Sequence, residues 1–93
     1  MSDDATKALL LSTLEVAVPL WIERLRDTSQ DEMSRMAGEA AQVVAEHGDH
    51  ILYKSKVKGQ TAAAFNALAR GLAILSFVPG GATFMGQKFE AKR

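Results

Sequence analysis

A chain of 93 residues with 47% apolar and 24% charged side chains is long enough for one folded domain, residues 1–93, and too apolar for a disordered segment. It contains no cysteine, which excludes disulfides and thiolate zinc sites and fits a reducing cytoplasm. Its net charge of zero is unevenly divided. Residues 1–48 hold four basic and nine acidic side chains, whereas residues 49–93 hold seven basic and two acidic ones.

The first predicted element is a helix over residues 4–27. Apolar residues recur there at three- and four-residue spacing, as one buried stripe requires: Leu10, Leu14, Ala17, Val18, Trp21, Ile22 and Leu25. Pro19 lacks an amide hydrogen and clashes with the carbonyl four residues earlier, so we expect this helix to be kinked or divided in the preceding turn. Leu9, Leu11 and Val16 widen the apolar surface beyond one stripe, which indicates packing against another subunit.

The second predicted helix begins after Ser29. Ser29 and Glu32 form a capping box, in which the hydroxyl accepts from the Glu32 amide and the carboxylate reaches back to the cap amide. Its narrow apolar stripe consists of Met33, Met36, Ala37, Ala40, Val44 and His47. Gly48 is expected to end the helix in a left-handed conformation.

The end of this helix also contains the one cluster of potential metal ligands. His47 and His50 lie three residues apart with acidic residues nearby, which suits a divalent ion if the backbone turns appropriately. Cysteine and a third histidine are lacking, and a histidine near a helix C-terminus is the ordinary explanation. We therefore predict no metal site and no cofactor.

The periodicity changes to two over residues 50–58. Lys54, Lys56 and Lys58 share one side of this predicted strand, an arrangement typical of an edge strand protected by lysines. Together with Lys88 they are also a candidate anion site, because a predicted helix N-terminus follows them. The sequence leaves open whether these lysines bind phosphate or nucleic acid or are simply solvated, since P-loop spacing is missing.

The third predicted helix covers residues 61–77, and its alanines and Gly71 would let another helix approach closely. Residues 78–81 stop it, because proline disfavours continuation and the glycines supply a turn. The segment 82–92 is predicted to form one strand with a bulge at Gly86, which places Phe84 and Phe89 on one face. We expect this strand to pair antiparallel with residues 50–57.

The C-terminal part of the chain carries a series of motifs over roughly the last third of the sequence: Phe65 to Leu72, Pro79-Gly80-Gly81, Thr83-Phe84, Gly86 and Phe89-Glu90-Ala91. This series resembles a signature found in short uncharacterised proteins of actinobacteria and their phages. It implies a small accessory protein of a bacterial cytoplasm, of bacterial or phage origin. No activity comes with it, so no functional residue is carried over.

The sequence therefore predicts a helix-dominated α+β domain in the order ααβαβ, with three helices, or four if Pro19 divides the first, and a two-stranded antiparallel ribbon. No serine or threonine has a histidine or acidic residue at a spacing typical of a catalytic pair. We therefore expect that the protein is not an enzyme and has no catalytic residue. The leading hypothesis is a cytoplasmic, self-associating protein without a membrane span, which binds a partner macromolecule. Its expected interface residues are Trp21, Leu11, Phe84 and Phe89. The alternative is a nucleic-acid or nucleotide binder that uses the basic C-terminal half.

Overall fold

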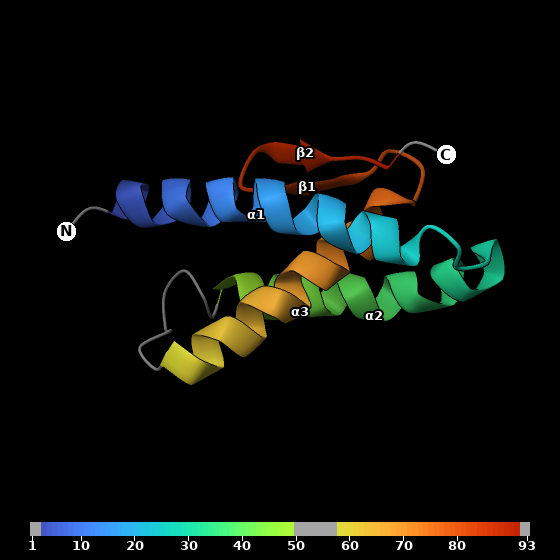
Figure 1. Cartoon of the computed structure of the whole chain (residues 1–93), viewed down its shortest axis with the longest axis horizontal. Helices are drawn as coiled ribbons and strands as arrows, with labels where there is room; N and C mark the ends of the chain where they lie inside the picture. Colours follow the sequence, from blue (N-terminus) through green and yellow to red (C-terminus); the bar gives the residue numbers. More distant parts are fainter. Residues whose placement is uncertain (1–2, 50–57, 92–93) are drawn as a thin grey trace.

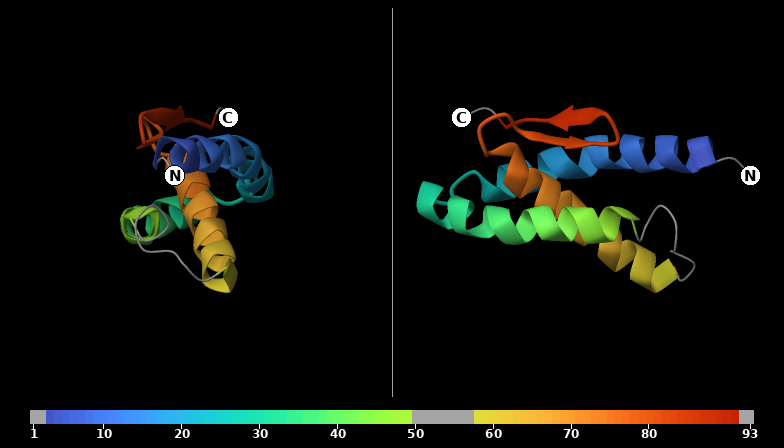
Figure 2. Two further views of the ribbon diagram at one scale, coloured as in Figure 1. Left: turned by 90° about the vertical axis from the view of Figure 1, so that its left-hand side faces the viewer. Right: turned by 180° about the vertical axis from the view of Figure 1, so that it is seen from behind.

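The computed structural model describes residues 3–49 and 58–91 and contains three helices and two short strands within them. In chain order these elements are α1 (Asp3–Leu25), α2 (Gln30–Asp49), α3 (Lys58–Ser76), β1 (Ala82–Phe84) and β2 (Gln87–Phe89). α3 contacts both α1 and α2, and the two strands lie alongside α1 in every view (Figures 1 and 2). The predicted helix-dominated α+β class with a two-stranded antiparallel sheet is confirmed.

α1 runs as one helix past Pro19, so of the two expected alternatives, a kinked or a divided helix, the division does not occur. Pro19 and Glu15, the residue whose carbonyl loses its usual amide partner, are both exposed. Water can therefore reach the carbonyl that the proline leaves unpaired, which lowers the cost of the lost hydrogen bond. The buried stripe of α1 lies on the other side, where Leu14 and Val18 are fully covered.

α2 begins as the sequence predicts. The Ser29 hydroxyl accepts a hydrogen bond of 3.2 Å from the Glu32 amide, which satisfies one of the free donors at the helix N-terminus. The second half of the expected capping box is replaced, because the Glu32 carboxylate forms an ion pair with Arg35. At the other end α2 continues past Gly48 to Asp49, so Gly48 does not end it.

α3 is the central element of the core. Leu68, Leu72, Ala73 and Ile74 are buried, and they include neighbours in sequence that point to different sides of the helix. A helix covered on several sides needs partners on each, and α1, α2 and both strands supply them. The helix starts at Lys58, three residues before the predicted start.

Gly71 is a point of close approach between α2 and α3. A β-carbon at this position would lie 2.9 Å from Val44 Cγ2 and 3.3 Å from the Ala40 carbonyl oxygen. Such distances are shorter than ordinary contacts, so any larger residue would have to displace the Val44 side chain and shift the α2 backbone at Ala40 slightly. The expectation that Gly71 permits close helix packing is confirmed.

The C-terminal segment forms a hairpin, and the expectation of one long strand with a bulge is wrong. β1 pairs antiparallel with β2, Ala82 opposite Phe89. Met85 and Gly86 make the turn between them, with φ angles of 53° and 81°. Positive φ at both central residues gives a hairpin turn whose twist matches that of the strands. Phe84 and Phe89 share a face as predicted, through this turn and not through a bulge.

The strand expected at residues 50–57, and its pairing with the C-terminal segment, lie outside the described residues. Within the described chain, the hairpin is fixed to the end of α3. The Ala91 amide donates to the Ser76 carbonyl at 2.9 Å, and the Gly81 amide donates to the Val78 carbonyl at 2.8 Å. Phe89 and Ala82 then pack into the core beside α3.

Replacing Gly71 by alanine is expected to lower the free energy of unfolding by about 1–2 kcal/mol, because the added methyl group overpacks the α2–α3 contact. This loss outweighs the gain of up to about 1 kcal/mol in helix propensity. Gly38→Ala is the matched control, since Gly38 lies in α2 with no heavy atom within 4 Å of the added carbon. It should stabilise the protein. Urea unfolding followed by fluorescence of the single tryptophan measures both variants, and equal effects would contradict the packing argument.

Two hairpin glycines should respond differently to alanine. Gly86→Ala places a side chain at positive φ in open space, so we expect a loss of about 1 kcal/mol. Gly81→Ala adds the same kind of strain, at a φ of 71°, and puts the new carbon 2.6 Å from the Phe89 carbonyl oxygen. It should therefore destabilise the protein more, with faster amide exchange in β1 and β2. A larger loss for Gly86→Ala in thermal unfolding would overturn this ranking.

Candidate functional site

A groove of about 480 Å³ lies between α2 and α3. Its apolar lining is buried or half-buried and consists of Met36, Ala40, Val43, Ala67, Gly71 and Ile74. Its charged lining is more exposed and consists of Glu32, Arg35, Glu39 and Arg70. The groove therefore combines an apolar floor with a rim of both charge signs.

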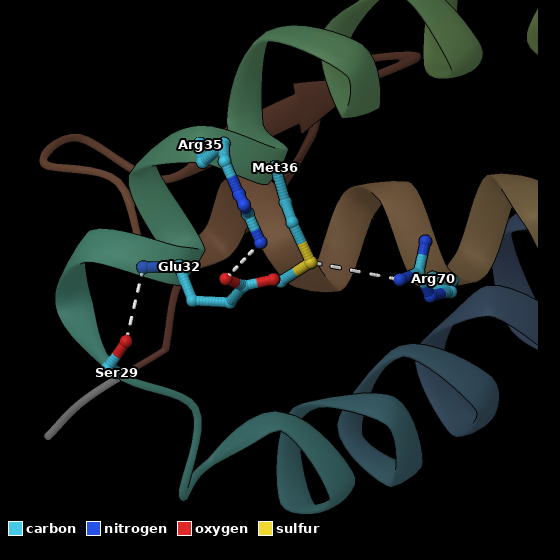
Figure 3. Close-up of polar contacts among 5 residues, drawn as sticks. All are labelled: Ser29, Glu32, Arg35, Met36 and Arg70. Carbon is cyan, nitrogen blue, oxygen red and sulfur yellow. Dashed lines mark hydrogen bonds and ion pairs between the residues drawn. The ribbon is translucent and has the colours of Figure 1, made fainter.

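Polar contacts organise one end of this groove (Figure 3). Arg35 pairs with Glu32 one turn earlier on α2, and the hydrogen bond from Arg35 together with the Glu32 charge raises the pKa of the guanidinium above its ordinary value. Arg70 crosses from α3 and donates to the Met36 sulfur at 3.8 Å. This long contact is weak, and it leaves the exposed Arg70 guanidinium at the groove mouth without a carboxylate partner among the described residues.

The polar groups that line the groove are two carboxylates and two guanidinium groups. The described lining includes no hydroxyl, thiol or imidazole. Elsewhere in the described ranges, 3–49 and 58–91, no group of three or more histidine, aspartate or glutamate residues is placed to hold a metal ion. What the groove offers is apolar contact area with charged groups around it.

The second surface is the outer side of α1, which we call the outer stripe: Leu9, Thr13, Val16 and Leu20. Three of these residues are the exposed large apolar residues of the described chain, with exposed fractions of 69% for Leu9, 65% for Val16 and 63% for Leu20. They lie opposite the buried stripe of the same helix. Figure 1 shows no described element in front of α1; α3 lies below this helix, and the hairpin lies above and behind it (Figure 2).

Hydroxyl groups on this side of α1 are satisfied inside the helix. The Thr13 hydroxyl donates to the Leu9 carbonyl oxygen at 2.8 Å, and the Ser12 hydroxyl donates to the same oxygen at 3.0 Å. Covering the outer stripe with apolar groups would therefore leave few hydrogen-bond donors without a partner, which lowers the free-energy cost of removing the stripe from water.

The four residues predicted to form an interface lie in different places. Trp21 is half-buried against the core, its ring lies 5.1 Å from the Arg24 guanidinium, and its indole donates to Asn66 at 3.3 Å. Leu11 is half-exposed on α1, and Phe84 is half-buried on β1. Phe89 is buried in the chain's own core and presents little surface to a partner, and its role in an interface stays a prediction.

Of the predicted anion site, only Lys58 and Lys88 lie within the described ranges, so the site stays a prediction. Lys54 and Lys56 fall in 50–57, outside those ranges, and Lys58 is the first residue of α3. Lys88 lies on β2, exposed, with its ammonium group 3.7 Å from the Glu90 carboxylate. The other described ion pairs, Arg26 with Glu23 and Arg35 with Glu32, are also local. None of the three joins the acidic first half of the chain to the basic second half.

The described residues of the C-terminal signature have structural roles. Gly81 and Gly86 provide the positive φ angles of the turns, and Phe89 fills the core. No protein-family model, curated protein or solved structure matches this chain. The resemblance to actinobacterial and phage proteins therefore remains a prediction, and function has to be argued from the two surfaces.

Sequence reasoning identified Leu9 and Val16 as excess apolar surface but named neither as an interface residue, and it missed Leu20 and the whole groove. The signal for the outer stripe was present in the spacing of four, three and four residues from Leu9 to Leu20. The groove had no comparable signal, because its lining comes from two helices whose relative position depends on Gly71.

Proposed function

We propose that this chain is a non-enzymatic binding protein that self-associates through the outer stripe of α1 and binds a partner macromolecule. The observation that carries the proposal is the exposure of Leu9, Val16 and Leu20 on one side of one helix. Single exposed leucines are ordinary, but three at helical spacing form a continuous apolar strip. Such a strip is stabilised when another apolar surface covers it.

The groove between α2 and α3 supports the second part of the proposal. Its rim carries Glu32 and Glu39 as well as Arg35 and Arg70, and this mixture favours a protein partner over a polyanion. The cysteine-free sequence and the C-terminal resemblance are in keeping with an accessory role in a bacterial cytoplasm. The described helices include none long and apolar enough to cross a membrane.

Self-association is expected to depend on Val16. Sedimentation equilibrium of the wild type should show a mass that rises with concentration towards a dimer or larger species, and Val16→Glu should weaken the association roughly a hundredfold. Two symmetry-related valines would each lose on the order of 1.5 kcal/mol of apolar burial. Ala41→Glu is the control, because it adds the same charge at an exposed position of α2 outside the groove lining.

The solvent exposure of Val16 means that the variant should keep its fold, which circular dichroism can check. A wild type that stays monomeric at all accessible concentrations would end the proposal. Equal weakening by Ala41→Glu would show that added charge, and not the loss of the outer stripe, is responsible.

Partner binding is expected to depend on Arg70. Native mass spectrometry of the protein purified gently from its own kind of cell should show a bound protein, which Arg70→Glu loses because the charge pattern of the groove rim is reversed there. Gly38→Ala, an exposed change on α2 away from the groove, should keep it. A bound nucleic acid, or a protein retained by Arg70→Glu, would count against the groove.

A further inference from the structure

The lining of the groove between α2 and α3 selects the kind of segment that fits it. The groove follows α2 from Glu32 to Val43, a rise of about 16 Å or three helical turns. We propose that it binds an amphipathic α-helix of a protein partner, with an apolar stripe on the floor, an acidic residue on one flank and a basic residue on the other. This inference rests on the partner binding proposed above and adds the form and charge pattern of the partner.

The walls of the groove favour a helix over an extended peptide. Both walls are helices, whose main-chain amides and carbonyls are hydrogen-bonded within each helix, and the lining has no hydroxyl or amide side chain. An extended peptide on the apolar floor would bury amides and carbonyls of its own without partners, which costs free energy. A helical segment satisfies these groups internally and presents only side chains to the floor.

Small residues give the floor its depth. The hollow of about 480 Å³ lies beside Ala40, Ala67 and Gly71, so apolar side chains of a docked helix have room to enter between α2 and α3. Met36 is half-buried in the same lining, and its unbranched side chain adjusts to the shape of the side chains that enter.

Two charges beside the floor lack a partner of opposite sign within the described chain. Glu32 and Arg35 neutralise each other in the ion pair of Figure 3, which leaves Glu39 on α2 and Arg70 on α3. Both are exposed, and neither takes part in an ion pair among the described residues. A helix lying between them is therefore complementary when it turns an acidic residue towards Arg70 and a basic residue towards Glu39.

The contact that Arg70 makes now is easily exchanged for an acid. Its guanidinium donates to the Met36 sulfur at 3.8 Å, a weak hydrogen bond to a neutral atom. A carboxylate on the partner would replace it with a charge-assisted hydrogen bond, which is about twice as strong as a neutral one. The Met36 side chain would then be free to pack against the apolar stripe of the partner.

Three stapled helical peptides test the charge pattern. The staple is needed because an isolated helix of so few turns is marginal in water. All three carry leucines at alternating spacings of four and three residues on one face. The flanks of this stripe carry glutamate on one side and lysine on the other in the mixed peptide, glutamate on both in the acidic peptide, and lysine on both in the basic peptide. Reversing a helix exchanges its flanks, so the mixed peptide matches the groove in one of its two directions.

The preferred peptide should change with the charges of the groove. In fluorescence anisotropy, the wild type should bind the mixed peptide about fivefold more tightly than the other two, because a mismatched flank replaces an attraction with a repulsion. Glu39→Arg should prefer the acidic peptide, and Arg70→Glu the basic one. The double variant Glu39→Arg/Arg70→Glu should prefer the mixed peptide again, and raised salt should reduce every preference.

A neutral substitution tests the floor. Ala67→Gln places a longer, polar side chain in the half-buried lining and should weaken binding of the mixed peptide about tenfold, because one leucine loses its apolar contact. Ala41→Gln is the matched control, since Ala41 is exposed on α2 outside the lining, and it should bind like the wild type. Circular dichroism checks that each variant keeps its fold.

The outcomes separate this inference from the function on which it rests. Preferences that follow the charges in all four proteins, with a loss in Ala67→Gln and none in Ala41→Gln, support it. A wild type that prefers the acidic peptide, or binds all three equally, overturns the charge pattern, and binding to none of them overturns the helical partner. If a protein partner from the cell is still released by Arg70→Glu, the proposed function survives without this inference. A wild type that binds no peptide and purifies without a protein partner overturns both.

Discussion

The tight approach of α2 to α3 at Gly71 is the contact on which the arrangement of this small protein depends. It lets Ala40 and Val44 close one side of α3 while α1 closes another, so that a single helix supplies the centre of the core. A chain of 93 residues has little other apolar material for a core. The same approach sets the width of the groove, whose lining includes Gly71 and Ala40. The packing of the core and the width of the groove therefore both depend on the close approach at Gly71.

The hairpin completes the core with few residues. Two strands of three residues are marginal alone, and here they are fixed through Ala91 to the end of α3 and through Phe89 to the core. The glycines of the C-terminal signature are needed for backbone conformation at Gly81 and Gly86, and for space at Gly81. These steric requirements explain the glycines of the signature without any bound ligand. The surfaces that could bind a partner lie elsewhere, on α1 and in the groove.

α1 has apolar residues on opposite sides. Leu14 and Val18 face the core, while Leu9, Val16 and Leu20 face outwards, and only the first set has a partner within the described chain. A helix of this kind retains an unfavourable interaction with water that a second copy would relieve. The two surfaces lie on different elements, the outer stripe on α1 and the groove between α2 and α3. The proposed self-association through the outer stripe would leave the groove open to a partner.

The sequence alone determined the local features: the helix periodicities, the Ser29 cap, the stop after α3 and the role of Gly71. These follow from interactions between residues close in the chain or from the steric needs of one residue. Tertiary structure decided the rest. Pro19 stays within one helix because its side faces solvent, the segment after residue 81 folds back because Met85 and Gly86 both take positive φ, and Phe89 becomes core because the hairpin turns it towards α3. Each outcome depends on which surface is covered, and that depends on contacts between residues far apart in the chain.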